Sequence, residues 1–125
     1  MGTTILVVDD DASITKLATE FLEPLGYEIL TALNGKEALE INRKYEEKID
    51  LLLIDVVMPS NNGIELAKIL QQKRPYMQVI LMSGYPADIV APKGIIESNI
   101  HFINKPLRRT TLTNIIQTAL DKKTG

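Results

Sequence analysis

The feature that most constrains the fold is an alternation of short apolar runs with longer amphipathic stretches along the 125 residues. Three of the runs are almost continuously apolar, which is typical of parallel strands covered on both faces. The five runs are Thr4–Val8, Glu28–Thr31, Leu51–Ile54, Gln78–Met82 and His101–Ile103. We therefore expect five parallel strands in one sheet.

The stretches between the runs space their apolar residues by three and four, which is the pattern of one helix face. Asn34 with Glu37, and Asn62 with Glu65, match the capping box that begins many helices. Expected helices cover Ser13–Leu25, Asn34–Glu46, a range starting at Asn62, a short or irregular piece from Pro92 to Ser98, and Thr110–Leu120. Strands alternating with helices predict one doubly wound α/β domain, (βα)5, over residues 1–125.

The composition narrows the classes of partner and site. The 14 basic and 16 acidic residues give a net charge of −2, which argues against nucleic acid as a direct partner. There is no cysteine, so disulfides and thiolate sites are excluded, and a reducing cytoplasm is the expected compartment. No apolar run approaches the roughly 20 residues of a membrane span, so we expect no membrane insertion.

Chemically active side chains follow four of the five predicted strands. Asp9 and Asp10 follow the first, Asp55 the third, Ser83 the fourth, and Lys105 the fifth. In an open parallel sheet, ligands bind beyond the carboxyl ends of the strands. We therefore expect three carboxylates, a hydroxyl and an ammonium to converge at one edge.

Carboxylates packed this closely repel one another, by roughly 4 kcal/mol for a pair about 4 Å apart at an effective dielectric constant near 20. Lys105 offsets part of this repulsion, and a hard divalent cation would offset more. Oxygen ligands suit Mg²⁺, with Mn²⁺ as a second candidate. One carboxylate could then attack phosphorus and form an aspartyl phosphate. Asp55 is the best candidate because it stands alone after the central strand, whereas the paired Asp9 and Asp10 suit ion binding.

Each of these residues also has a simpler explanation when taken alone. Asp11 and its acidic neighbours could cap the first helix, and Asp55 or Ser83 could be turn residues. Lys105 could be a surface lysine beside a turn. Their shared position at the strand ends favours one joint functional site over four separate structural roles. His101, the only histidine, is expected to be a strand-surface residue rather than a ligand.

Four motifs together resemble the response-regulator receiver domain, the fold of the chemotaxis response regulator. They are Ile5 to Asp11, Asp55 to Pro59 followed by Asn62-Gly63, Met82 to Tyr85, and Phe102 to Pro106. The resemblance covers essentially the whole chain and implies the strand order 2-1-3-4-5. The segment from Ser83 to Lys105 is most similar to receivers fused to hybrid histidine kinases, which would make the chain a domain of a longer protein.

The resemblance also implies residue roles. Asp55 would accept a phosphoryl group from a phosphohistidine on a histidine kinase or histidine phosphotransfer protein. Mg²⁺ would be held by Asp10, Asp55 and the Val57 carbonyl, with Asp9 acting through water. Ser83 and Lys105 would contact the phosphoryl group. The Lys105–Pro106 bond would be cis, and the domain would catalyse its own dephosphorylation.

Phe102 matches the aromatic switch position of the family, although it could simply be a core residue. In the implied mechanism, phosphorylation draws Ser83 inward and Phe102 follows into the vacated space. The surface formed by the fourth helix, fifth strand and fifth helix then changes, and an unknown output partner or fused domain recognises the change.

Val57 and Tyr85 flank the expected site without an amide or carboxylate to orient water, so we hypothesise a long-lived phosphorylated form. Arg108 replaces a frequent capping residue, which predicts a frayed start of the last helix.

Three other functions compete with this interpretation. Asp9, Asp11 and Ser13 mimic the start of a haloacid dehalogenase-type phosphatase, although the later acidic pair is missing. A flavodoxin-like binder would need a phosphate loop where the chain has three aspartates. A degenerate receiver that acts only as a protein-interaction module is disfavoured by the intact set of Asp10, Asp55, Ser83 and Lys105.

Overall fold

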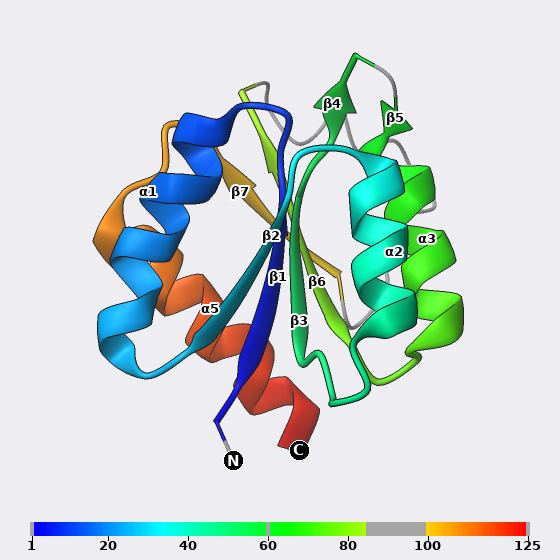
Figure 1. Cartoon of the computed structure of the whole chain (residues 1–125). Coiled ribbons are helices and arrows are strands. Elements are labelled where there is room, and N and C mark those ends of the chain that lie inside the picture. The colour runs from blue at the N-terminus through cyan, green and yellow to red at the C-terminus, as the bar shows by residue number, and fades with distance from the viewer. Residues whose placement is uncertain (1, 60, 85–99, 125) are drawn as a thin grey trace.

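The computed structural model describes residues 2–59, 61–84 and 100–124, and within them five parallel strands form one sheet. The order across the sheet is β2-β1-β3-β6-β7 (Figure 1). The strands are β1 (Thr4–Val8), β2 (Glu28–Ala32), β3 (Leu51–Asp55), β6 (Gln78–Ser83) and β7 (Ile100–Asn104). Numbered among themselves, these five strands have the order 2-1-3-4-5, which confirms the predicted fold.

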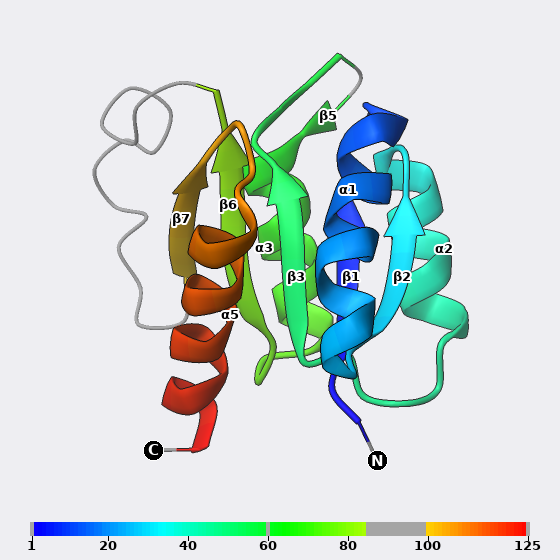
Figure 2. The ribbon, with the colours of Figure 1, turned by 90° about the vertical axis from the view of Figure 1, so that its left-hand side faces the viewer.

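Helices connect the strands and cover both faces of the sheet (Figure 2). They are α1 (Ala12–Leu22), η1 (Glu23–Leu25), α2 (Gly35–Lys44), α3 (Gly63–Lys73) and α5 (Arg109–Thr124). The helix expected over Ser13–Leu25 is thus an α-helix followed by a 3-10 turn that contains Pro24 and ends at Gly26, where φ is +97°. The piece expected from Pro92 to Ser98 lies outside the described residues.

Two apolar cores lie on opposite faces of the sheet, because successive strand residues point to opposite sides. On one face, Leu52 and Ile54 of β3 share a core with Ala38 of α2 and Leu66 of α3. On the other face, Leu51 and Leu53 share a core with residues of α1 and α5. This division is the doubly wound arrangement that the apolar runs predicted.

Both predicted capping positions begin a helix. The Asn34 side chain accepts the Glu37 N–H at 2.9 Å, and the Glu37 side chain accepts the Leu33 N–H at 2.7 Å. Asn62 accepts the N–H groups of Ile64 and Glu65. At the last helix, the Arg108 carbonyl accepts the Leu112 N–H at 2.9 Å, so the first turn is formed despite the missing capping side chain.

The strands run further than expected at their carboxyl ends. Asp55 and Ser83, expected just after their strands, are the last residues of β3 and β6. The ladder continues there because the Val56 N–H donates to the Met82 carbonyl at 2.9 Å and the Lys105 N–H donates to the Ser83 carbonyl at 2.7 Å. These bonds fix the backbone at the edge where the polar residues meet.

A small antiparallel ribbon follows β3 and was not expected from the sequence. It pairs β4 (Val57–Met58) with β5 (Asn61–Asn62) and leads directly into α3 (Figure 1). The ribbon stands beyond the carboxyl end of the sheet, beside Asp55. It therefore forms one wall of the region where a ligand would bind.

Candidate functional site

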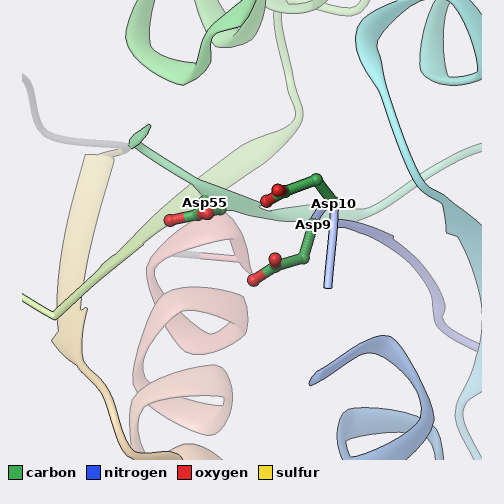
Figure 3. Close-up of side chains that lie close together, drawn as sticks. All are labelled: Asp9, Asp10 and Asp55. Carbon is green, nitrogen blue, oxygen red and sulfur yellow. The ribbon is translucent and has the colours of Figure 1, made fainter. Parts of the chain in front are cut away.

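Three carboxylates meet at the carboxyl edge of the sheet, as the sequence predicted. Asp9 and Asp10 follow β1, Asp55 ends β3, and each offers an oxygen that lies within 4.8 Å of those of the other two. Figure 3 shows the three side chains side by side. Asp9 is fully buried, Asp55 is 5% exposed, and Asp10 is exposed. The cluster is therefore buried at its base and open to solvent at Asp10.

Lys105 supplies the positive charge of the cluster from the end of β7. Its Nζ lies 2.8 Å from Oδ2 of Asp9 and 3.4 Å from Oδ2 of Asp55. The lysine side chain is 22% exposed. One ammonium thus bridges the two buried carboxylates, and its closer partner is Asp9.

The hydrogen bonds of the carboxylates distinguish their roles. Oδ1 of Asp9 accepts the Asp11 N–H at 2.9 Å, whereas the buried Oδ2 forms an ion pair with Lys105 and has no further polar partner among the described residues. Oδ1 of Asp55 receives only a long contact of 3.4 Å from the Val57 N–H. Asp10 and Asp55 consequently have the greater capacity to bind a ligand.

The crowding of charge shifts two pKa values. Burial raises the pKa of the Asp55 carboxyl, the charge of Asp9 raises it further, and Lys105 and the Val57 N–H oppose this only in part. Burial alone would lower the pKa of Lys105, but its hydrogen bond to Asp9 and the charges of both carboxylates outweigh burial and raise it. The isolated cluster therefore carries more negative charge than Lys105 can offset.

The donor set fits a hard divalent cation. The ligands are all oxygen, they come from two adjacent strands, and one of them is exposed. Mg²⁺ prefers one or two carboxylates together with water and phosphate oxygens. Asp10 and Asp55 match that preference, and an added dication would relieve the repulsion that raises the pKa of Asp55.

The other predicted site residues take the following positions. Ser83 is 1% exposed at the end of β6, next to Met82, which pairs with Asp55 in the ladder. Val57 is 57% exposed in the ribbon after Asp55. The Lys105–Pro106 peptide bond is cis. Tyr85 lies outside the described residues.

Phe102 occupies a position between core and surface. It is partly buried and packs against the core beneath α2 and α3. It also lines a hollow of about 370 Å³ together with Lys105, Pro106 and residues of α5. The ring therefore adjoins both the packed interior and the strand that carries Lys105.

Asp11 and His101 have structural roles that the simpler explanations anticipated. The Asp11 side chain caps α1 by accepting the Ser13 N–H at 2.9 Å, and this bonding lowers its pKa. The His101 ring lies 3.3 Å from the Gln78 side-chain oxygen on the neighbouring strand and does not belong to the acidic cluster.

Gly63 entered the sequence analysis only as part of a motif and without a separate role, yet this residue supports Asp55. A Cβ at position 63 would lie 1.9 Å from the Asp55 carbonyl oxygen and 2.8 Å from the Val56 Cα. The Gly63 N–H donates to the Val56 carbonyl at 2.9 Å. A glycine at the first position of a predicted helix, where other residues are better helix formers, was the available signal.

Comparison with known proteins agrees with this geometry. The response regulator receiver domain family matches residues 5–117. The chain belongs to the response regulator receiver family. It is therefore a receiver domain of the kind found in two-component systems, and the phosphatase and flavodoxin-like alternatives are set aside.

Three relatives illustrate the receiver match. The response regulator receiver protein CpdR of Brucella abortus is 32% identical over 93% of this chain and 95% of its own length. The sensor kinase CckA of the same species is 30% identical over 96% of this chain and 13% of its own. The crystal structure of the receiver domain from hybrid histidine kinase CckA has a TM-score of 0.80 at 32% identity, covering 94% of this chain and 98% of that domain.

The receiver spans between 13% and 48% of the length of the first three curated relatives. The activities of those longer proteins as a whole are therefore not assigned to this chain. Among the described residues, no helix combines the length and apolar character needed to traverse a bilayer.

Proposed function

We propose that this receiver, a single domain over residues 1–125, accepts a phosphoryl group on Asp55 from a phosphohistidine of a histidine kinase or phosphotransfer protein. The observation that carries the proposal is the arrangement of Asp55, with a weakly engaged carboxylate beside Asp10 and an ammonium 3.4 Å away. Such a carboxylate has an oxygen with few competing hydrogen bonds to attack phosphorus, and positive charge is already in place for the incoming group.

The reaction forms a P–O bond from an Asp55 oxygen and breaks the P–N bond of the donor, whose imidazole leaves and takes up a proton. Lys105 would move its ammonium from Asp9 toward the phosphoryl oxygens, because they carry the developing charge. The buried Asp9, with both oxygens engaged, supports a role in orienting Lys105 and a bound water rather than in direct ligation. Mg²⁺ held by Asp10, Asp55 and the Val57 carbonyl would neutralise charge on the transferred group.

The test is phosphorylation by acetyl phosphate with Mg²⁺, followed by intact mass measurement and peptide mapping. We expect one added phosphoryl group on Asp55, none in Asp55→Asn, and at least tenfold slower labelling in Asp10→Asn or without divalent ions. The matched control is Asp11→Asn, since Asp11 is also an aspartate next to the cluster but its side chain caps α1. Efficient labelling of Asp55→Asn, or no labelling of the wild type, would refute the proposal and favour a receiver that acts only by binding proteins.

We further propose that Phe102 and Ser83 transmit phosphorylation to the surface of β7 and α5. Asn104 pairs with Ser83 in the ladder, and the Lys105 N–H donates to the Ser83 carbonyl, so movement of Ser83 acts directly on the strand that carries Phe102. The partly buried ring packs against the core and also lines the hollow beside α5, so the ring is placed to respond to such a movement. Phe102→Ala should leave labelling of Asp55 intact and abolish the phosphorylation-dependent amide shifts of α5 in NMR spectra.

The lifetime of the phosphorylated form should depend on Val57. Its side chain is 57% exposed beside Asp55 and has no group that could orient an attacking water. We expect Val57→Asn to speed loss of the phosphoryl group several-fold, measured by mass spectrometry after removal of the donor. Val57→Leu is the control, because it preserves the apolar character; an Asn variant as slow as the Leu variant would contradict the role.

A further inference from the structure

A groove of about 650 Å³ lies between α2 and the end of α3, separate from the acidic cluster. Along α2 it follows Lys36, Leu39 and Arg43, which fall on one face of the helix at intervals of three and four. This face is about 10 Å long, or two helical turns. The opposite wall is formed by Lys73 and Tyr76. These two residues precede β6, so that wall lies toward the amino edge of the sheet, away from Asp55.

The groove is basic although the whole chain has a net charge of −2. Four cations line it, and Glu40 is the one carboxylate among its described lining residues. None of the four cations forms an ion pair within the described part of the chain. Lys48 adds a further positive charge nearby, since its Nζ lies 4.8 Å from the centre of the Tyr76 ring.

Each wall of the groove carries an exposed apolar side chain, and the two walls are tied together. Leu39 and Tyr76 are 36% and 38% exposed there. Arg74 joins the two walls, because its guanidinium donates to the carbonyls of Asn42 and Tyr45 at 3.0 and 2.7 Å and so caps the end of α2. It also donates to the Asn42 side chain at 2.5 Å. A groove held by such a network exists before any ligand binds, which lowers the cost of binding.

We propose that this groove binds an acidic amphipathic helix of a partner protein. Carboxylates of the helix would approach Lys36, Arg43 and Lys73, and an apolar side chain would cover Leu39 and Tyr76. Unpaired cations around exposed apolar side chains are complementary to this chemistry, and a groove with apolar contacts is a common binding site for an amphipathic helix. The site is distinct from Asp55 and does not require the phosphorylation proposed above.

Charge complementarity also favours a peptide over nucleic acid. A polyanion gains affinity by contacting several phosphates over an extended surface. The cations here are confined to two helical turns, on a chain whose remaining surface is acidic overall. A short helix can match the groove without approaching that surface.

The experiment titrates ¹⁵N-labelled receiver with a synthetic helix about four turns long, with leucine on one face and glutamate on the other. We expect amide shifts to cluster at Lys36, Leu39, Arg43, Lys73 and Tyr76. The variant Lys36→Glu/Lys73→Glu should bind about tenfold more weakly, which corresponds to the loss of two exposed charge pairs. Anisotropy of a labelled peptide gives the affinity.

The matched control is Lys16→Glu/Lys68→Glu, which changes the net charge equally at exposed positions that do not line the groove. It should bind the peptide as the wild type does. Equal weakening of both variants, or shifts confined to another face, would overturn the proposal. Tighter binding of oligouridylate than of the peptide at the same amides would overturn it in favour of nucleic acid.

Discussion

Asp9 and Asp55 share one cation, Lys105, and they share it unequally. The ammonium lies 2.8 Å from one carboxylate and 3.4 Å from the other, so it stabilises Asp9 more than Asp55. Asp55 is left with a raised pKa and a loosely held oxygen. The residue that we propose to be phosphorylated is thus the member of the cluster whose charge is least satisfied.

The raised pKa of Asp55 predicts a pH-dependent stability without metal. A carboxyl whose pKa is higher in the folded state favours folding below its unfolded pKa of about 3.9, and this contribution is lost as pH rises through the folded pKa. Asp55→Asn should therefore raise the melting temperature at pH 7 in EDTA by a few degrees. The gain should shrink as pH falls through the raised folded pKa of Asp55, because the wild-type carboxyl becomes protonated there.

Asp11 provides the control of opposite sign. Its hydrogen bonds to Ser13 lower its pKa, so its contribution to stability is present above the unfolded pKa and is lost as pH falls through the folded pKa. Asp11→Asn should not raise the melting temperature at pH 7. If both variants were stabilised equally, general charge reduction rather than the cluster would explain the effect.

Removal of the Lys105 ammonium should destabilise the protein, because the carboxylates of Asp9 and Asp55 would then repel each other without a cation between them. Lys105→Met keeps the apolar stem but leaves Asp9 buried without a cation, which should cost about 2 kcal/mol of unfolding free energy in EDTA. Urea denaturation measures this loss. The double variant Lys105→Met/Asp9→Asn should recover most of it, and strict additivity of the two changes would show that the pair is not coupled.

At the scale of elements, the start of α3 determines where Asp55 lies. The ribbon of β4 and β5 turns the chain back, Asn62 caps the helix, and Gly63 brings its first turn against the backbone of Asp55 and Val56. No side chain at position 63 would fit between this turn of the helix and that backbone. The helix thus acts as a support for the end of β3.

Gly63→Ala should accordingly displace the start of α3 and the end of β3 from each other. A Cβ at 1.9 Å from the Asp55 carbonyl oxygen cannot be accommodated without a backbone shift, which should cost about 2–4 kcal/mol. We also expect slower labelling of Asp55 by acetyl phosphate, measured under conditions where the variant is folded. Gly84→Ala is the control, because a Cβ there meets no atom of the described residues within 4 Å; comparable losses in both variants would contradict a specific role for Gly63.

At the scale of the whole molecule, the spacing of apolar residues along the sequence was enough to predict most of the fold. Apolar runs and capping residues predicted the five strands and the described helices, because burial on two faces imposes a regular pattern. The convergence of Asp9, Asp10, Asp55 and Lys105 followed from the shared direction of parallel strands. The preference of Lys105 for Asp9 could not be predicted, since it depends on a distance between segments far apart in sequence. The ribbon after Asp55 and the close contact at Gly63 depend on local backbone geometry, which residue types alone do not specify.

The most direct test of the account is a crystal structure of the receiver grown with Mg²⁺ and beryllofluoride, which mimics a phosphoryl group. We predict beryllium bound to an Asp55 oxygen, Mg²⁺ coordinated by Asp10 and Asp55, and the Lys105 ammonium moved from Asp9 toward fluoride. Beryllofluoride bound to a different side chain, or a metal ion held away from Asp10 and Asp55, would contradict it.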